Sequence, residues 1–187
     1  MTKNDKIVSF ESERLILVDD DDNVLGFKSK AECHNGEGIL HRAFSIFIFN
    51  SQGQVIMQKR AKEKRLWPLI WSNSCCSHPR EGESYEYATE RRLKEELGLQ
   101  TELDYLYKFR YHAKWKDEGS ESELCSVYIG KSDDLPQVNE TEIDEWKFFS
   151  REELNAELDN NPELYSPWFK MEWKEIQDNF WDRVEAL

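Results

Sequence analysis

The segment Ser84–Leu97 constrains the fold more than any other part of the chain, because it has the signature of a helix at both ends. Its first residue is a serine that can cap a helix, and Gly98 suits the left-handed position at which many helices end. Apolar side chains recur between these ends on a roughly helical period. Arg92 and Glu96 are four residues apart and therefore share one face. The adjacent carboxylates of Glu95 and Glu96 suit either surface ion pairs or a cation that bridges phosphate oxygens.

A thiol and an imidazole lie immediately before this helix. The stretch Trp71–Pro79 contains Cys76 and His78, and ordinary core packing does not call for that mixture of residues. We therefore interpret this stretch, together with the helix that follows it, as an active site.

Short runs of aromatic and β-branched residues elsewhere predict a sheet. Residues 44–49 are almost continuously apolar, and with residues 54–57 across a turn they predict a central hairpin. The acidic segment Asp19–Asn23 lacks the spacing and the distal glutamate of an EF-hand, which favours a solvated turn over a calcium loop. Further strands are predicted at 14–18, 24–27, 105–111 and 124–129, a short helix at 28–34, and two helices after residue 151.

A basic cluster follows the predicted hairpin. The segment Lys59–Arg65 has five basic residues out of seven, in a chain whose formal net charge is −13. A solvated surface loop is the usual explanation of such a run. Its position beside the candidate site favours a second explanation, in which these side chains attract and hold an anionic ligand such as a diphosphate.

The few histidines suggest a metal site. The chain has four histidines, and three separate segments each offer one. Glu121 and Glu123 are two residues apart, so on a strand both carboxylates point the same way. A single histidine is more often structural than a ligand. Together, however, these groups would form a mixed nitrogen and oxygen site for zinc, manganese or magnesium.

Composition narrows the class of protein. A length of 187 residues suits one domain, and an apolar fraction of 39% suffices for a sizeable core. The net charge of −13 argues against a nucleic-acid partner, because phosphate backbones require a basic surface. The four cysteines show no CxxC spacing, the first residues form no apolar signal segment, and no run approaches a membrane span. We expect a cytoplasmic protein that does not contact a membrane.

In their order and combination, the motifs resemble those of type 1 isopentenyl-diphosphate delta-isomerases, a branch of the Nudix superfamily. The resemblance covers about residues 12–181 and depends on these residues: His34 and His41, Asn73–Pro79, Arg91–Gly98, Phe109–Tyr111, Glu121–Glu123 and Ser166–Trp168. It implies a single domain over residues 1–187, with residues 1–11 as a peripheral N-terminal segment. The implied architecture is an α/β/α sandwich with a mixed sheet and added C-terminal helices.

The Nudix sequence pattern is matched at several positions and broken at two. The matching residues are Glu83, Arg91, Leu93, Glu95, Glu96 and Gly98. Arg92 stands where the pattern expects a glutamate, and the loss of that metal-binding carboxylate points away from hydrolysis. The isomerase branch is similar in having arginine there. Ser77 stands where glycine is expected, and its effect on the loop behind Cys76 stays open.

The activity that the resemblance implies is the interconversion of isopentenyl diphosphate and dimethylallyl diphosphate in isoprenoid biosynthesis. Moving the double bond requires a proton to be added on one side and another to be removed from the opposite side, so two acid–base groups must face each other. The family's cysteine and glutamate correspond to Cys76 and Glu123, and Tyr111 corresponds to their hydrogen-bonding partner. Proton addition leaves a tertiary carbocation, and Trp168 matches the tryptophan whose indole face stabilises it in a dry site.

The resemblance also implies two metal ions and a diphosphate site. One divalent ion (Mn²⁺, Zn²⁺ or Mg²⁺) would be held by three histidines and two glutamates, His34, His41, His78, Glu121 and Glu123. A Mg²⁺ ion bound to the diphosphate would be held by Glu96. The implied diphosphate contacts are Lys30, Arg60, Lys64 and Arg92.

Two rival functions remain open. A Nudix hydrolase of nucleoside diphosphate derivatives would release phosphate, and Arg92 argues against it. A catalytically silent binding module would be expected to lose Cys76 or Glu123, and both are present. We expect a small-molecule diphosphate as the partner, and a monomer or a weak dimer.

Overall fold

Strand β3 (His41–Phe49) organises the sheet, because it pairs with four other strands. The computed structural model describes residues 5–187. In it β3 runs antiparallel to β1 (Arg14–Val18), β4 (Val55–Arg60) and β6 (Cys75–Ser77), and parallel to β8 (Gly119–Lys131). The other strands of this mixed sheet are β2 (Val24–Ser29), β5 (Trp71–Ser72), β7 (Leu103–Trp115) and β9 (Ile143–Phe149).

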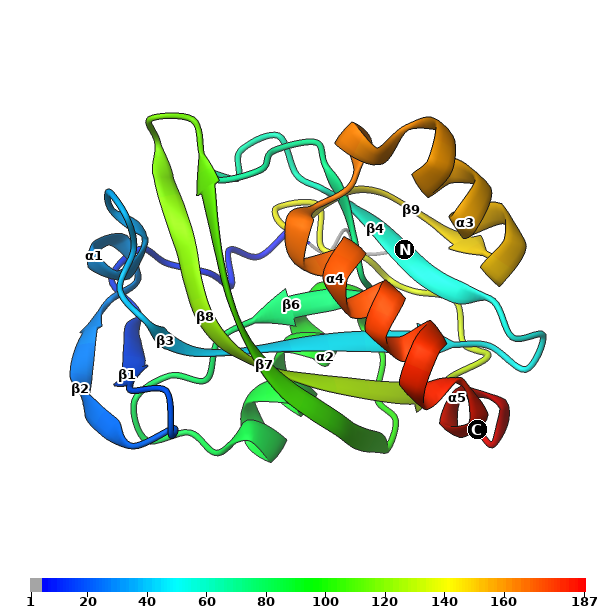
Figure 1. The fold of residues 1–187 in the computed structure, drawn as a ribbon, viewed down its shortest axis with the longest axis horizontal. Coiled ribbons are helices and arrows are strands. Elements are labelled where there is room, and N and C mark those ends of the chain that lie inside the picture. Colours follow the sequence, from blue (N-terminus) through cyan, green and yellow to red (C-terminus); the bar gives the residue numbers. More distant parts are fainter. Residues whose placement is uncertain (1–4) are drawn as a thin grey trace.

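Helices cover both faces of the sheet (Figure 1). In chain order they are α1 (Lys30–His34), α2 (Tyr85–Leu97), α3 (Arg151–Asn160), the 3₁₀ turn η1 (Pro162–Leu164), α4 (Pro167–Glu175), the π-helical turn η2 (Ile176–Phe180) and α5 (Trp181–Glu185). Helix α2 lies behind the sheet in Figure 1, and α4 and α5 lie in front of it. Within residues 5–187, no helix combines the length and the apolar character needed to cross a membrane.

Alternating side chains of β3 supply a core to each face. Phe44 and Ile46 are fully buried in one cluster with Leu93 of α2. Phe47 is fully buried in the other cluster with Phe169 of α4. Burying each such side chain contributes roughly 1.5–3 kcal/mol. The expected α/β/α sandwich with a mixed sheet and added C-terminal helices is confirmed.

Helix α2 has the ends that its sequence predicts. The Ser84 hydroxyl accepts a hydrogen bond from the backbone N–H of Tyr87 at 3.2 Å. Gly98 ends the helix in the left-handed conformation at φ 68°. The predicted serine cap and glycine stop are therefore confirmed.

Most predicted strands are present, and the last two are longer than expected. Strands β7 and β8 form one hairpin that pairs from Leu103 and Gly130 to Trp115 and Gly119, so pairing extends both beyond their apolar runs. The acidic segment is the expected turn, because the Asp19 carboxylate accepts backbone N–H groups within it. The C-terminal region has three α-helices instead of the two predicted, because the π-helical turn η2 and the non-helical backbone of Phe180 (φ −132°) separate α5 from α4.

The N-terminal segment expected to be peripheral lies partly outside the described residues, because residues 1–4 are not described. Residues 5–10 have no regular secondary structure. Within them Val8 is buried, and its carbonyl accepts hydrogen bonds from Arg80 and Arg92. This segment therefore has fixed contacts with the rest of the fold.

Candidate active site

A cavity of about 920 Å³ lies beside β6, β8 and the start of α4. Its wall contains most of the residues that the sequence predicts for the site, namely Lys30, His34, Arg60, Lys64, Cys76, His78, Arg92, Tyr111, Glu121, Glu123 and Trp168. Two other predicted residues, His41 and Glu96, are buried but are not part of that wall. Segments far apart in the sequence thus meet around one cavity.

The pairing of β6 with β3 positions Cys76. In this antiparallel pair Cys76 lies opposite Ser45, and Ser77 lies opposite Phe44. The described non-glycine residues with positive φ do not include Ser77. Because only positive φ favours glycine over other residues, the strand accommodates a serine at this position without strain.

Arg60 lies next to the Cys76 thiol. Its Nη1 is 3.8 Å from the Cys76 Sγ, while its Nε and Nη2 each donate to a loop carbonyl, those of Trp67 and Leu66, at 3.1 Å. Burial raises the pKa of Cys76 to about 12, and Arg60 offsets only part of this effect. Cys76 is therefore a protonated thiol at neutral pH in this state.

Glu123 and Tyr111 are direct partners across β7 and β8. The Tyr111 hydroxyl donates a hydrogen bond to the Glu123 Oε2 at 2.5 Å. Burial, followed by the neighbouring Glu121 carboxylate, raises the pKa of Glu123 well above its ordinary value. Both effects favour the protonated carboxyl over the carboxylate. The cavity therefore has two groups, Cys76 and Glu123, that are able to carry a transferable proton.

Three imidazoles and two carboxylates converge beside these groups. The ligand atoms of His34, His41, His78, Glu121 and Glu123 all lie within 4.8 Å of one another. Helix α1 contributes His34, β3 contributes His41, and the residue directly after β6 is His78. The parallel pairing of β3 with β8 places His41 opposite Glu123. The sequence prediction that these five residues lie together is confirmed.

The hydrogen bonds of the histidines fit a divalent cation. The Nδ1 atoms of His34 and His41 each lie 2.7 Å from a backbone carbonyl, which can only accept, so Nδ1 carries the proton in the neutral rings. Each Nε2 then presents a lone pair. Among the described residues, the His41 Nε2 is buried without a hydrogen-bond partner, and the His34 Nε2 lies 2.7 Å from the Glu121 Oε2. A nitrogen and oxygen donor set of this kind suits a divalent ion such as Zn²⁺ or Mn²⁺.

The charges around these donors also favour a cation. Burial, with His34 next, lowers the pKa of His41 to about 4, so this ring is neutral and its lone pair is available. Burial opposes ionisation of Glu121, but His34 lowers the pKa of this carboxyl to about 2. Burial likewise opposes protonation of His34, yet Glu121 raises its pKa overall. A positive charge is therefore favoured between these side chains.

Basic side chains line another part of the wall. Burial and the neighbouring Lys64 lower the pKa of Lys30, as expected where cations crowd together. Not all of the basic cluster Lys59–Arg65 takes part, because Lys59 pairs with Asp144 and Glu145 and Lys62 pairs with Glu63. Arg60, Lys64 and Arg65 line the cavity. These cations form an anion-attracting surface within an acidic protein.

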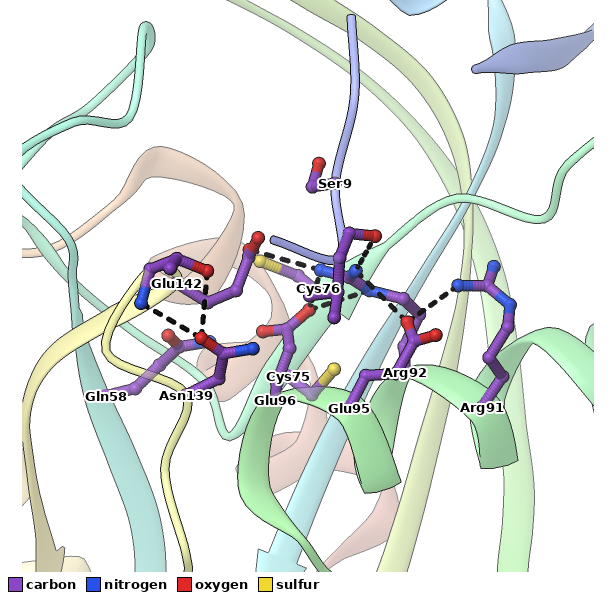
Figure 2. A network of polar contacts seen from close by, with 12 residues as sticks. Ser9, Gln58, Cys75, Cys76, Arg91, Arg92, Glu95, Glu96, Asn139 and Glu142 are labelled. Carbon is purple, nitrogen blue, oxygen red and sulfur yellow. Dashed lines mark hydrogen bonds and ion pairs between the residues drawn. The ribbon is translucent and has the colours of Figure 1, made fainter. Parts of the chain in front are cut away.

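Arg92 is the centre of a buried ion network (Figure 2). Its Nε donates to the Glu96 Oε1 at 3.0 Å, and its Nη2 donates to the Glu142 Oε2 at 3.1 Å. Glu142 also pairs with Lys64. Glu96 is therefore turned toward Arg92, which explains its absence from the cavity wall. Sequence reasoning missed Glu142, which lies in an acidic segment with no motif of its own.

Trp168 closes the apolar side of the cavity. It lies in the first turn of α4, directly after Pro167, and its Nε1–H donates to the Ser72 hydroxyl at 2.9 Å. Its ring centroid is 6.2 Å from that of Tyr111. The Arg60 guanidinium lies 5.5 Å from the Trp168 ring centroid, so this indole face already accommodates positive charge.

The N-terminal segment forms part of the cavity wall, which sequence reasoning did not predict. Asp5, Ile7, Ser9 and Glu11 line the cavity. The Ser9 hydroxyl accepts a hydrogen bond from the Lys30 Nζ at 2.5 Å. Every second residue of this segment lines the cavity, but the segment is too short for such a pattern to indicate a binding site from the sequence.

Comparisons with known proteins agree with this arrangement. Residues 39–169 match the NUDIX domain family. The chain is 44% identical over 174 residues to isopentenyl-diphosphate Delta-isomerase 1 of Photorhabdus laumondii subsp. laumondii, covering 92% of this chain and 99% of the relative. It is 43% identical over 175 residues to isopentenyl-diphosphate Delta-isomerase of Serratia proteamaculans, covering 94% and 97%. A solved structure from Deinococcus radiodurans has a TM-score of 0.66 at 27% identity, covering 80% of this chain and 90% of that one.

Proposed function

This chain belongs to the isopentenyl-diphosphate Delta-isomerases of the NUDIX domain family, and we propose that it interconverts isopentenyl diphosphate and dimethylallyl diphosphate. One observation supports this proposal most directly. Cys76 and Glu123 line the same cavity as the basic residues Lys30, Arg60 and Lys64. An allylic proton shift on a diphosphate requires both features, two groups that exchange protons and a surface that holds an anion.

The proposed binding mode places the diphosphate on the basic wall. Lys30, Arg60, Lys64 and Arg92 are the proposed contacts, and arginine forks are well matched to phosphate oxygens. Arg92 is held by Glu96 and Glu142, so it is already oriented before the substrate binds. The isopentenyl chain would then extend toward Cys76 and Trp168.

The proposed chemistry adds a proton at one end of the isopentenyl chain and removes one at the other. A protonated group gives its proton to C4, and the electron pair of the C3=C4 bond forms the new C–H bond. The resulting tertiary cation at C3 loses a proton from C2 to the second group, and the released electron pair forms the C2=C3 bond. Cys76 and Glu123 are the proposed pair, and the Tyr111 hydroxyl orients Glu123. The indole of Trp168 stabilises the cation without attacking it.

The proposed active site also holds two divalent ions. His34, His41, His78, Glu121 and Glu123 would hold one ion, Mn²⁺, Zn²⁺ or Mg²⁺, and Glu96 would help to hold a Mg²⁺ ion bound to the diphosphate. When bound, such ions supply positive charge that neutralises the diphosphate and shifts the pKa of neighbouring acids. The proposal also includes a cytoplasmic setting, a small-molecule diphosphate as the sole partner, and a monomer or weak dimer.

The test is to incubate the purified protein with isopentenyl diphosphate and Mg²⁺ in ²H₂O. We expect dimethylallyl diphosphate to form and deuterium to enter the C4 methyl group, both observable by NMR. Phosphate release is measured in the same samples, because a hydrolase would release phosphate without forming the allylic isomer. Absence of the isomer with fully metal-loaded protein would refute the proposed activity.

A further inference from the structure

A buried carboxyl group lies outside the residues of the proposed mechanism. Glu172 is in α4, one helical turn after Trp168, and its side chain is completely buried. Its Oε1 accepts a hydrogen bond from the Cys125 thiol, with 3.6 Å between the sulfur and the oxygen. Its Oε2 is buried without a hydrogen-bond partner, and within residues 5–187 no lysine or arginine pairs with this carboxyl. Unpaired buried carboxyl groups are rare because burial of charge is costly.

Packing alone does not explain a carboxyl at this position. The neighbouring residues of α4, Phe169 and Trp173, are buried in the apolar core cluster that also contains Ile176. An apolar side chain of similar volume would join that cluster without loss of hydration. The carboxyl therefore has a cost that a purely structural residue would avoid.

The strands separate Glu172 from the reacting groups by only one layer of side chains. The Cys125 thiol, which contacts Glu172, lies 3.5 Å from the Ser45 hydroxyl. Ser45 is the cross-strand partner of Cys76 on β6, and Cys125 is two residues after Glu123 on β8. Side chains two residues apart on a strand share one face. Glu172 thus lies one layer of side chains away from the cavity, on the same side of the sheet.

The groups that face this carboxyl are neutral or acidic. They are Ser45 on β3, Cys76 on β6, Tyr107 on β7, and Cys125 and Glu123 on β8. The Tyr107 hydroxyl is likewise buried without a partner in the described part of the chain. Because no lysine or arginine among residues 5–187 forms an ion pair with it, the charge of an ionised Glu172 acts on the cavity through a medium of low polarity, where electrostatic interactions are strong.

Ionisation of Glu172 falls within the range of physiological pH. Burial raises the pKa of Glu172 to about 7, and hydrogen bonds from Ser45 and Cys125 offset part of that effect. The charge also reaches the active site, because Glu172 contributes to the raised pKa of Cys76. A small change of pH therefore adds or removes a negative charge behind the reacting groups.

We propose that Glu172 acts through its charge. As a carboxylate, it makes the electrostatic potential in the cavity more negative and so stabilises the carbocation formed by proton addition. It does not touch the substrate and acts through the preorganised field of the site. This inference rests on the proposed isomerase activity. It goes beyond that activity because it makes the rate depend on a residue that neither binds the substrate nor exchanges a proton with it.

The test compares kcat of the wild-type protein with that of Glu172→Gln between pH 5.5 and 8.5, both fully metal-loaded. Glutamine keeps the volume and the hydrogen-bonding capacity and removes the charge. We expect the ratio of wild-type to variant kcat to rise from about one at pH 5.5 to about tenfold at pH 8.5, because only the carboxylate favours the cation. KM should be unchanged, since the diphosphate contacts are intact.

A matched control is Glu175→Gln, which removes a charge from the same helix one turn further on. Its ratio should stay near one throughout the pH range. A constant ratio for Glu172→Gln would indicate a merely structural role and overturn the proposal, as would a ratio below one at high pH. If Glu172→Gln does not fold, Glu172→Asp decides the question: it should keep the rise of kcat with pH, and a flat profile would refute the inference. Failure of the wild-type protein to isomerise the substrate would instead refute the proposed function.

Discussion

The Tyr111 hydroxyl donates a 2.5 Å hydrogen bond to the Glu123 carboxylate, and both side chains line the cavity. A phenol in this position holds one carboxylate oxygen and leaves the other directed toward the histidines, since the Glu123 Oε1 lies 2.8 Å from the His78 Nε2. One carboxylate therefore belongs to both the proposed proton-transfer site and the candidate metal site.

Replacing Tyr111 by phenylalanine removes this hydrogen bond and keeps the ring. We expect kcat to fall by about 10- to 100-fold, because Glu123 loses the group that orients it, while KM changes little. Steady-state kinetics at saturating Mg²⁺ measures the effect. Tyr105→Phe, which removes an exposed hydroxyl from the same strand, serves as the control and should have wild-type kinetics.

Cys76→Ala and Glu123→Gln should each abolish turnover, with a loss of at least about 100-fold, because each removes one of the two proton-exchanging groups. Thermal unfolding should show that Cys76→Ala is folded. Cys33→Ala provides a matched control, since it removes a buried thiol that does not line the cavity. A near-normal rate in Cys76→Ala or Glu123→Gln would exclude the proposed mechanism.

His41→Ala should reduce the bound divalent ion to well below one equivalent. His41 is fully buried, and its Nε2 has no hydrogen-bond partner among the described residues. Elemental analysis after gel filtration measures the metal content. His112→Ala is the control, because His112 lies at the surface and bonds to the Glu37 carbonyl, and it should retain the wild-type content. Equal metal content in both variants would count against the candidate metal site.

Trp168→Phe tests the stabilisation of the cation. Phenylalanine keeps an aromatic wall but has a weaker interaction with positive charge, so kcat should fall by about tenfold with little change in KM. Trp168→Phe also leaves the Ser72 hydroxyl without its indole donor, which a Trp168→Phe, Ser72→Ala double variant accounts for. If KM rises and kcat is unchanged, Trp168 contributes to binding rather than to the reaction.

Glu172→Gln should stabilise the fold at alkaline pH. Because burial raises the pKa of Glu172 from 4.5 to about 7, the folded protein holds a proton that the unfolded chain loses in this interval. The free energy of unfolding of the wild-type protein is therefore reduced as pH rises from 4.5 through 7, by about 3 kcal/mol in total. The variant lacks this reduction. Chemical denaturation should give equal stabilities near pH 4.5 and a gain for the variant at pH 8, and an equal gain at both would contradict the assignment.

Local sequence signals predicted the elements whose stability is local. Helix α2 begins after Ser84 and ends at Gly98, as its capping residues indicate. The apolar runs predicted the strands β3 and β4 and the turn between them, and the two strands pair directly only at Phe49 and Val55. The length of the β7–β8 hairpin could not be predicted in this way, because the polar residues beyond its apolar centre are held by pairing between the two strands.

Residues of the site that carry a motif could also be predicted, whereas those defined by long-range contacts could not. The convergence of the three histidines with Glu121 and Glu123 is one prediction of the first kind. Glu142 reaches Arg92 and Lys64 only because the chain folds back over the helix. The sequence does distinguish Glu172, because it is a single acidic residue on the otherwise apolar face of α4.

The alignment of β3 beside β8 has a practical consequence for variants made anywhere in this protein. His41 faces Glu123 only in the observed pairing of the two strands, and a slip by one residue would turn one set of donor atoms to the far side of the sheet. Binding of a metal ion at this site would therefore depend on the correct register of β3 and β8. A variant that keeps all five candidate ligands and is helical but takes up no metal would be expected to have a misaligned sheet, a defect that circular dichroism alone would not detect.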